Sequence, residues 1–214
     1  DFVAGDLVLL IPQGPFMCPP APYEAAMLLH DAFSARGIRD AVRMAVHTFE
    51  GAPMGTAGPE MGRFVVEELT ARGIAFHPQR ATVRVDADAR RVVFADGAEA
   101  SYDLLLAVPR HAAPEVVHAA GLTGPSGWVP VDPRTLRVQG PLAVDGVYAV
   151  GDVTTLALPG RFKPDVGLVL PKAGAFAAAE GRVVAEQIAA GVLARAPREA
   201  FEGEGFCYLE MGGG

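Results

Sequence analysis

Two cysteines are the residues of this sequence best suited to redox chemistry. Cys18 lies in a proline-rich loop, Cys18-Pro-Pro-Ala-Pro-Tyr-Glu, directly before an expected helix. The N-terminus of a helix carries partial positive charge, which stabilises a thiolate, the reactive form of cysteine. Cys207 lies in a second segment, Gly205–Gly212, near the other end of the chain. Two thiols can form one disulfide, structural or redox-active, and each cysteine taken alone is equally compatible with a small buried side chain.

A second set of residues is suited to binding a sugar-containing ligand. The apolar segment Tyr148–Val150 leads directly into Gly151-Asp152-Val153. Ligands of open α/β sheets bind beyond the carboxyl ends of the strands. Glycine at that point lets a ligand approach the backbone, and Asp152 can accept hydrogen bonds from hydroxyl groups. A Gly-Asp turn without a ligand is also common, so this motif indicates a site only together with the other segments.

The third segment, Pro171-Lys172-Ala173-Gly174, opens an alanine-rich helix. Small residues at Gly174, Ala178 and Gly181 form a stripe on which a flat group or another backbone can pack closely. Lys172 lies at the helix start, where the helix dipole disfavours a cation, and this favours a specific role for its ammonium group. A tight helix–sheet contact beside a solvated lysine is the alternative.

The elements that position these residues follow an α/β pattern. Apolar runs that alternate with amphipathic helices ended by Gly37 and Gly73 predict a parallel βαβ unit. The string Ala-Arg-Gly-Ile occurs at both helix ends, which predicts the same local structure twice. We expect strands and helices in this order: strand 7–11, helix 22–35, strand 42–47, helix 60–72, an antiparallel meander over 82–94, strands 104–108 and 147–150, helix 172–190 and a final strand 206–211.

Composition narrows the classes of function. The formal charge is −7 over 214 residues and Lys and Arg form no basic run, so we expect no nucleic-acid partner. No apolar run reaches the roughly 20 residues of a membrane-spanning helix. The histidines show no ligand spacing with the cysteines, so we expect no metal site. The chain starts at Asp1 without Met and ends in three glycines, and we expect both ends to be cuts through a longer protein.

Taken together, these segments resemble one family along nearly the whole chain. They are similar to sulfide:quinone oxidoreductases and to the flavin subunit of flavocytochrome c sulfide dehydrogenase, within the FAD-dependent pyridine nucleotide-disulfide oxidoreductase superfamily. The resemblance implies that Cys18 and Cys207 are the redox-active, catalytic pair. It implies that Gly151, Asp152 and Val153 hold FAD, and that Lys172, Ala173 and Gly174 approach the isoalloxazine from the start of a helix.

The resemblance also implies a division into domains. Residues 1–103 would form an NAD(P)-binding-like inserted domain that carries Cys18, and residues 104–214 would form the C-terminal part of a Rossmann-like FAD-binding domain. The family's G-x-G-x-x-G fingerprint for FAD pyrophosphate does not occur in this chain. We therefore expect a C-terminal fragment that lacks the first half of the FAD domain, about 100–160 residues by typical domain size. A membrane-contacting segment of the family would follow Gly214.

Three hypotheses on function follow. In the first, the parent enzyme oxidises sulfide or a small thiol through the cysteine pair and passes electrons through the flavin to a quinone or a cytochrome haem. In the second, the parent resembles type II NADH dehydrogenases and oxidises NAD(P)H, which leaves both cysteines without a role. In the third, the chain is a folded, non-catalytic fragment that does not retain FAD. We expect a cytoplasmic or peripheral membrane location.

Overall fold

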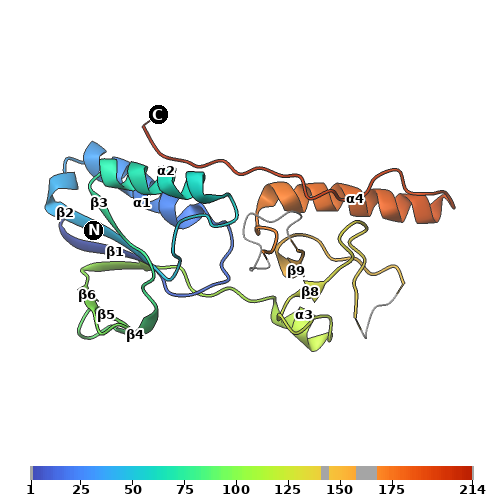
Figure 1. The fold of residues 1–214 in the computed structure, drawn as a ribbon, viewed down its shortest axis with the longest axis horizontal. Coiled ribbons are helices and arrows are strands. Elements are labelled where there is room, and N and C mark those ends of the chain that lie inside the picture. Colours follow the sequence, from blue (N-terminus) through green and yellow to red (C-terminus); the bar gives the residue numbers. More distant parts are fainter. Residues whose placement is uncertain (1, 141–144, 158–167, 214) are drawn as a thin grey trace. The chain divides into compact units, whose positions relative to one another are not determined.

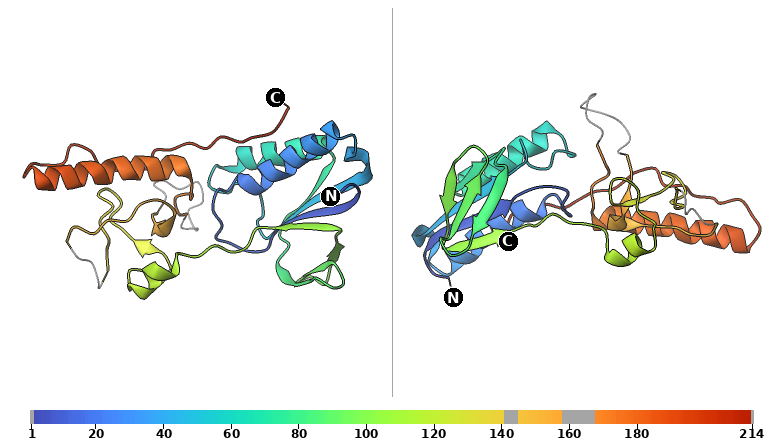
Figure 2. Two further views of the ribbon diagram at one scale, coloured as in Figure 1. Left: turned by 180° about the vertical axis from the view of Figure 1, so that it is seen from behind. Right: turned by 90° about the horizontal axis from the view of Figure 1, so that it is seen from below.

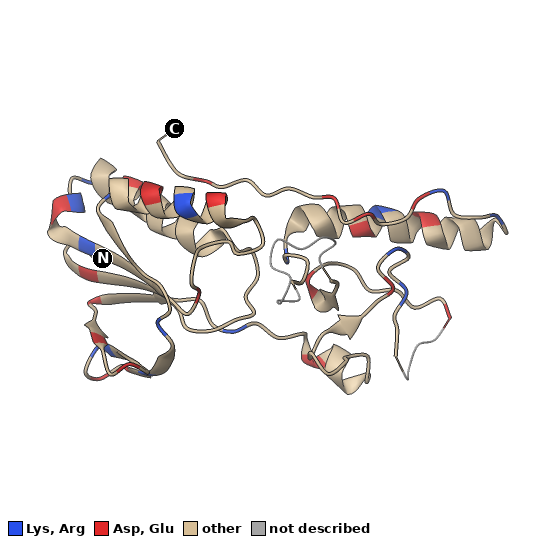
Figure 3. Cartoon of the chain, in the orientation of Figure 1, with Lys and Arg blue, Asp and Glu red and all other residues tan. Residues whose placement is uncertain are grey.

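The computed structural model describes residues 2–140, 145–157 and 168–213. The chain forms two compact units, one made of Asp1–His111 and Tyr208–Gly214 and the other of Ala112–Cys207. Among the described residues, no helix has both the length and the apolar character that a membrane crossing requires. Lys and Arg are interspersed with Asp and Glu over the helices and loops of both units (Figure 3).

The first unit is built on a parallel four-stranded sheet. Its strands are β1 (Gly5–Ile11), β2 (Val42–Thr48), β3 (Ile74–His77) and β7 (Leu104–Ala107), in the order β3-β2-β1-β7 (Figure 1). β1 pairs with β2 on one side and with β7 on the other. Residues 7–11 are almost fully buried, as a central strand covered on both faces must be.

The two faces of this sheet bury alternate residues of β1. Leu7, Leu9 and Ile11 share a core with helices α1 (Ala21–Ala35) and α2 (Pro59–Ala71). Val8 and Leu10 pack with residues of an antiparallel meander on the opposite face. The meander consists of β4 (Thr82–Asp86), β5 (Arg91–Phe94) and β6 (Glu99–Ser101). Figure 2 shows the helices and the meander on opposite sides of the sheet.

The two Ala-Arg-Gly-Ile strings adopt the same structure, as predicted. Gly37 and Gly73 end α1 and α2 with φ angles of +68° and +64°, which favour glycine. Their N–H groups donate to Ser34 and Thr70 at 3.0 Å and 2.9 Å. A short 3₁₀ helix, η1 (Arg39–Ala41), follows the first of these turns.

The second unit has little sheet. It contains helices α3 (Glu115–Ala119) and α4 (Gly174–Val192), the 3₁₀ turn η2 (Gly151–Val153), and the short parallel strands β8 (Val129–Pro130) and β9 (Thr154–Thr155). Its core gathers apolar residues from these elements and their loops: Val129, Val131, Leu136, Val138, Leu156, Leu170, Val183 and Phe201. The predicted alanine-rich helix is confirmed as α4, displaced by two residues.

Two predicted strands are wrong. Residues 147–150 form one isolated bridge, between Tyr148 and Arg137, and Val150 is 38% exposed. Residues 136–138 lie beside this segment and form two backbone hydrogen bonds with it, and Val147 and Ala149 pack against the core of the second unit. This pairing is too short to form a strand. Residues 206–211 are also outside any strand. From Tyr208 onward they are part of the segment that belongs to the first unit.

The compact units divide after His111, because β7 is hydrogen-bonded to β1 and belongs to the first sheet. The predicted boundary after Asp103 concerns the division into cofactor domains, and it stays a prediction.

Candidate functional site

The loop between β1 and α1 carries Cys18. The thiol-bearing residue has a φ of +53°, a left-handed conformation that is uncommon outside glycine. Its carbonyl accepts the N–H of Ala21 at 2.9 Å, which joins the loop to the start of α1. A second connection fixes the loop to the chain after β7: Met17 N–H donates to His111 Nδ1 at 2.9 Å, and His111 N–H donates to the Pro15 carbonyl at 2.9 Å.

This loop follows β1, the strand at which the order of strands in the sheet reverses. From β1 the chain passes to β2 on one side, while β7 joins β1 on the other, and ligands of open α/β folds bind at the carboxyl ends of such a strand pair. A cavity of about 530 Å³ occurs there, lined by Leu9, Met17, Pro22, Leu106 and His111 among others. Its volume lies within the usual range of small-molecule sites.

The first turn of α1 has its backbone donors already engaged. Pro20 and Pro22 have no N–H group. The Ala21 N–H donates to Cys18, and those of Tyr23 and Glu24 donate to the Pro20 carbonyl at 2.9 Å and 3.0 Å. In dinucleotide-binding folds these are the groups that receive a pyrophosphate, so this helix start is poorly equipped to bind one.

A buried polar pair lies beside the same helix start. Tyr23 is fully buried and its hydroxyl donates to Glu50 Oε2 at 2.5 Å, while the Thr48 hydroxyl donates to the same oxygen at 3.2 Å. Burial raises the pKa of Glu50, against the opposing effect of these two hydrogen bonds. Burial, with the neighbouring Glu50 carboxylate, also raises the pKa of Tyr23 well above its usual range. Glu50 lies two residues after the end of β2, and it was not among the site residues predicted from the sequence.

Cys207 is exposed and is the last residue of the second unit, whereas Cys18 is half-buried in the first. The next residue, Tyr208, begins the segment that belongs to the first unit. The pairing of the two cysteines stays a prediction.

The Gly-Asp motif forms the tight turn η2. Gly151 has a φ of +72°, and a β-carbon added there would lie 3.2 Å from Cβ of Ala177 on α4. The Gly151 N–H donates to a carboxylate oxygen of Glu180, and the Thr154 hydroxyl donates to the Gly151 carbonyl at 2.9 Å. Glycine is therefore required both by the backbone conformation and by the closeness of α4.

Lys172 stabilises this turn through hydrogen bonds to backbone carbonyls. Its Nζ donates to the carbonyls of Asp152 and Thr154, the second at 2.9 Å, and lies 3.6 Å from the ring centroid of buried Trp128. Burial lowers the pKa of Lys172 to about 8, against the opposing effect of Asp152 and Glu180. The ammonium group is thus bound by backbone carbonyls of the same chain. The sequence predicted a specific role for this lysine, and in the structure its ammonium group makes a structural contact.

Glu180 is the residue of this turn that sequence reasoning missed. It is 1% exposed, and burial raises the pKa of its carboxyl, while the bond from Gly151 opposes that shift. A signal was present in the sequence: Glu180, Val183 and Gln187 follow at helical spacing, and all three are buried on α4.

The two glycines of the small-residue stripe on α4 both face open space. A β-carbon added at Gly174 or Gly181 would meet no described atom within 4 Å. The N-cap residue Ala173 has no side chain able to cap the helix. Between η2 and the start of α4 the structure leaves a space of only about 10 Å³, which corresponds to at most one water molecule.

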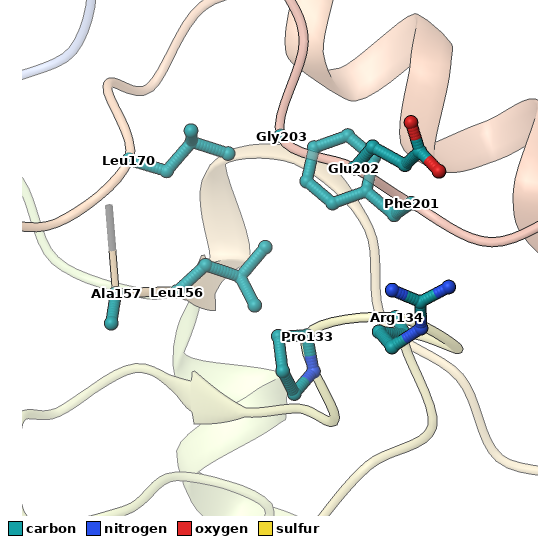
Figure 4. A pocket seen from close by; sticks show the side chains of 8 residues that line it. All are labelled: Pro133, Arg134, Leu156, Ala157, Leu170, Phe201, Glu202 and Gly203. Carbon is teal, nitrogen blue, oxygen red and sulfur yellow. The ribbon is translucent and has the colours of Figure 1, made fainter. Parts of the chain in front are cut away.

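A larger cavity of about 310 Å³ lies between Leu156, Leu170 and Phe201 (Figure 4). None of the predicted site residues lines it.

The family model described as "Pyridine nucleotide-disulphide oxidoreductase" matches residues 43–171, which is more than half of the chain. The chain belongs to the pyridine nucleotide-disulphide oxidoreductase family. The match runs from β2 to the residue before Lys172 and includes the Gly-Asp turn, while both cysteines lie outside it.

Within this family the chain is similar to proteins described as sulfide:quinone oxidoreductases. The mitochondrial protein of that description from Mus musculus is 24% identical over 161 residues, covering 72% of this chain and 35% of the mouse protein. The solved structure from Aquifex aeolicus is 26% identical with a TM-score of 0.71, covering 88% of this chain and 44% of that chain. The NAD-dependent persulfide reductase of A. fulgidus shares the fold, with 21% identity, a TM-score of 0.59, and coverage of 91% and 32%.

This family member therefore spans less than half the length of the relatives it matches. The predicted α/β class and the predicted superfamily are confirmed.

Proposed function

We propose that this chain is the cysteine-carrying part of an FAD-dependent oxidoreductase that oxidises sulfide or a small thiol. The observation that carries the proposal is the position of Cys18. It lies in the β1–α1 loop, at the carboxyl ends of β1 and β7, where a dinucleotide-binding unit has its glycine-rich phosphate loop. The similarity to proteins described as sulfide:quinone oxidoreductases supports it.

Two features of the first unit argue against NAD(P)H as the substrate bound there. The first-turn donors of α1 are absent or engaged within the loop, as described above. The acid after β2, which in dinucleotide-binding folds accepts the ribose hydroxyls, is here Glu50, whose Oε2 already receives Tyr23 and Thr48. Both features favour a thiol enzyme over a reductase resembling type II NADH dehydrogenases.

The residues around η2 fit the part of FAD that the family resemblance assigns to them. A side chain at position 151 would press on Ala177, so the backbone of this turn stays uncovered by a side chain of its own. Asp152 is half-buried. A β-carbon added at Gly174, at the start of α4, would face open space. Lys172 and Glu180 hold the turn in this conformation. FAD, when bound, supplies a two-electron acceptor.

The cysteines carry the sulfur chemistry. Hydrosulfide attacks one sulfur of a Cys18–Cys207 disulfide, the S–S bond breaks, and one cysteine becomes a persulfide while the other leaves as a thiolate. A second thiolate or hydrosulfide then takes the outer sulfur, which leaves two reduced cysteines. The proton of the attacking hydrosulfide leaves with the outer sulfur, so both cysteines are left as thiolates. Removal of two electrons from these thiolates restores the disulfide, and a quinone or cytochrome finally receives the electrons.

The test uses the full-length protein with bound FAD. Flavin absorbance is followed after anaerobic addition of sulfide to the wild type, Cys18→Ser and Cys207→Ser, with Glu67→Ala on the exposed face of α2 as the control. We expect bleaching in the wild type and the control and its loss in both cysteine variants. Unchanged bleaching in the serine variants contradicts the proposal, and bleaching of the wild type by NADH alone favours the reductase alternative.

A further inference from the structure

The C-terminal segment Leu209–Gly213, here called the strap, is bound to the helical face of the first unit. Figure 1 shows the chain end running past α1 and α2. The Glu210 N–H donates to Glu24 Oε1 at 2.9 Å and the Gly213 N–H donates to Asp31 Oδ2 at 2.6 Å. Nη2 of Arg72, just after α2, donates to the Met211 carbonyl at 3.0 Å.

The strap also packs through alternate side chains. Leu209 and Met211 are half-buried against the core shared by the sheet and the two helices, while Tyr208 and Glu210 are exposed. Gly212 and Gly213 have φ angles of +74° and +81°, and a β-carbon on Gly212 would collide with the Asp31 carboxylate. The glycines are thus required for the backbone to reach Asp31.

The two carboxylates that hold the strap come from one helix face. Glu24 and Asp31 are seven residues apart, which places them on the same side of α1. Asp31 is itself oriented by His30, whose Nδ1 lies 3.0 Å from Oδ1. The hydrogen bond with His30, followed by that from Gly213, lowers the pKa of Asp31, so both contacts favour the charged form that binds an N–H strongly.

This arrangement relates to the redox residues through the covalent chain. Glu24 lies in the first turn of α1, six residues after Cys18, and the strap begins two residues after Cys207. We propose that Glu24 and Asp31 are positioning residues, which dock the strap on α1 and thereby present Cys207 to Cys18. This inference rests on the proposed function for the role of the two thiols.

The docking is tested by amide hydrogen exchange on the full chain. Glu24→Ala and Asp31→Ala remove the acceptors, whereas Glu24→Gln and Asp31→Asn keep an oxygen that can accept. We expect the Glu210 amide in the first alanine variant and the Gly213 amide in the second to exchange about tenfold faster than in the wild type. The amide variants should stay within about threefold. Unaltered exchange in the alanine variants overturns the proposal, and the amides of α2 serve as the internal reference for folding.

The positioning is tested by the rate of disulfide formation. The chain has two cysteines, so oxidation of the reduced protein by diamide, which takes two electrons and two protons, gives a single intramolecular product. We expect this rate to fall at least about threefold in the alanine variants and to recover with Gln and Asn, because an undocked strap samples more conformations. Equal rates in all five proteins overturn the positioning role.

The two proposals fail differently. The proposed function is rejected if the flavin of the full-length protein reacts independently of sulfide. The positioning role still holds in that case if docking and disulfide formation behave as expected. Sulfide-dependent bleaching that is lost in Cys207→Ser but unaffected by Glu24→Ala and Asp31→Ala would reject the positioning role alone.

Discussion

The hydroxyl of Tyr23 donates to Oε2 of Glu50 at 2.5 Å and joins the start of α1 to the end of β2 inside the first unit. Tyr23 is five residues from Cys18 along the chain, and its ring is fully buried. This pair connects the start of the helix that follows the cysteine loop to the acid that follows β2.

Replacing Tyr23 with Phe should destabilise the chain. The ring stays, but Glu50 loses the donor that compensates its burial, at a cost of about 1–3 kcal/mol in the free energy of unfolding. Urea denaturation of the wild type and the variant measures this difference. Val116→Ala, at a residue that is 73% exposed, is the control and should cost less than about 0.5 kcal/mol. An equal cost at both positions would contradict the importance of the Tyr23–Glu50 pair.

Glu50 should give the unfolding free energy a defined dependence on pH. Its pKa in the folded state is raised above 4.5, so the folded state binds its proton more tightly than the unfolded state does. Its contribution to stability is fully present below the unfolded pKa and is lost as pH rises through the folded pKa. In Glu50→Gln this loss should disappear, so the variant gains stability relative to the wild type as pH rises. Parallel stability–pH curves would show that burial does not raise this pKa.

Lys172 should titrate unusually low. Its pKa in the folded state is about 8 and its ordinary value is 10.5. The unfolded chain therefore binds more protons between these values, and stability should rise with pH across that window. The sequence contains two lysines, Lys163 and Lys172, so NMR of the reductively methylated Lys163→Arg variant isolates the second one. A Lys172 resonance that titrates near 10.5 would contradict the buried contact with Trp128.

Gly151→Ala should destabilise the second unit. A left-handed alanine costs about 1–2 kcal/mol, and its β-carbon would press on Ala177 at 3.2 Å. Combining it with Ala177→Gly should recover part of the loss beyond what the separate costs predict, and a double-mutant cycle in urea measures that coupling. Strict additivity would show that the two positions do not meet.

The parallel unit could be predicted from sequence because its signals are local and agree with one another. Leu7–Ile11 is apolar without interruption, and the helices that follow end at glycines that must adopt positive φ. Burial of a central strand on both faces produces such a run directly. The fold class rests on these segments. The family resemblance rests on the Cys18 loop, the Gly-Asp motif, the helix start at Lys172 and the Cys207 segment.

The strap shows what local pattern could not decide. Residues 208–211 alternate between exposed and half-buried, as the residues of a half-buried strand would. The partner is not a strand, because the backbone donors of Glu210 and Gly213 bind the carboxylates of Glu24 and Asp31 on a helix more than 180 residues away in sequence. Periodicity reports which side chains face inward, but it carries no information about what they face.

The sequence by itself determined the α/β class, the family, the glycine turns and the two cysteine-bearing segments. Only the tertiary structure decided that Glu50, Glu180 and Lys172 turn their charged groups inward. Glu50 accepts a hydrogen bond from Tyr23, Glu180 accepts one from Gly151, and Lys172 donates to the carbonyls of Asp152 and Thr154. From the sequence alone, an isolated acidic or basic residue is predicted to be exposed to solvent, because its partner is distant in sequence. A buried charge is tolerated only where folding supplies that partner.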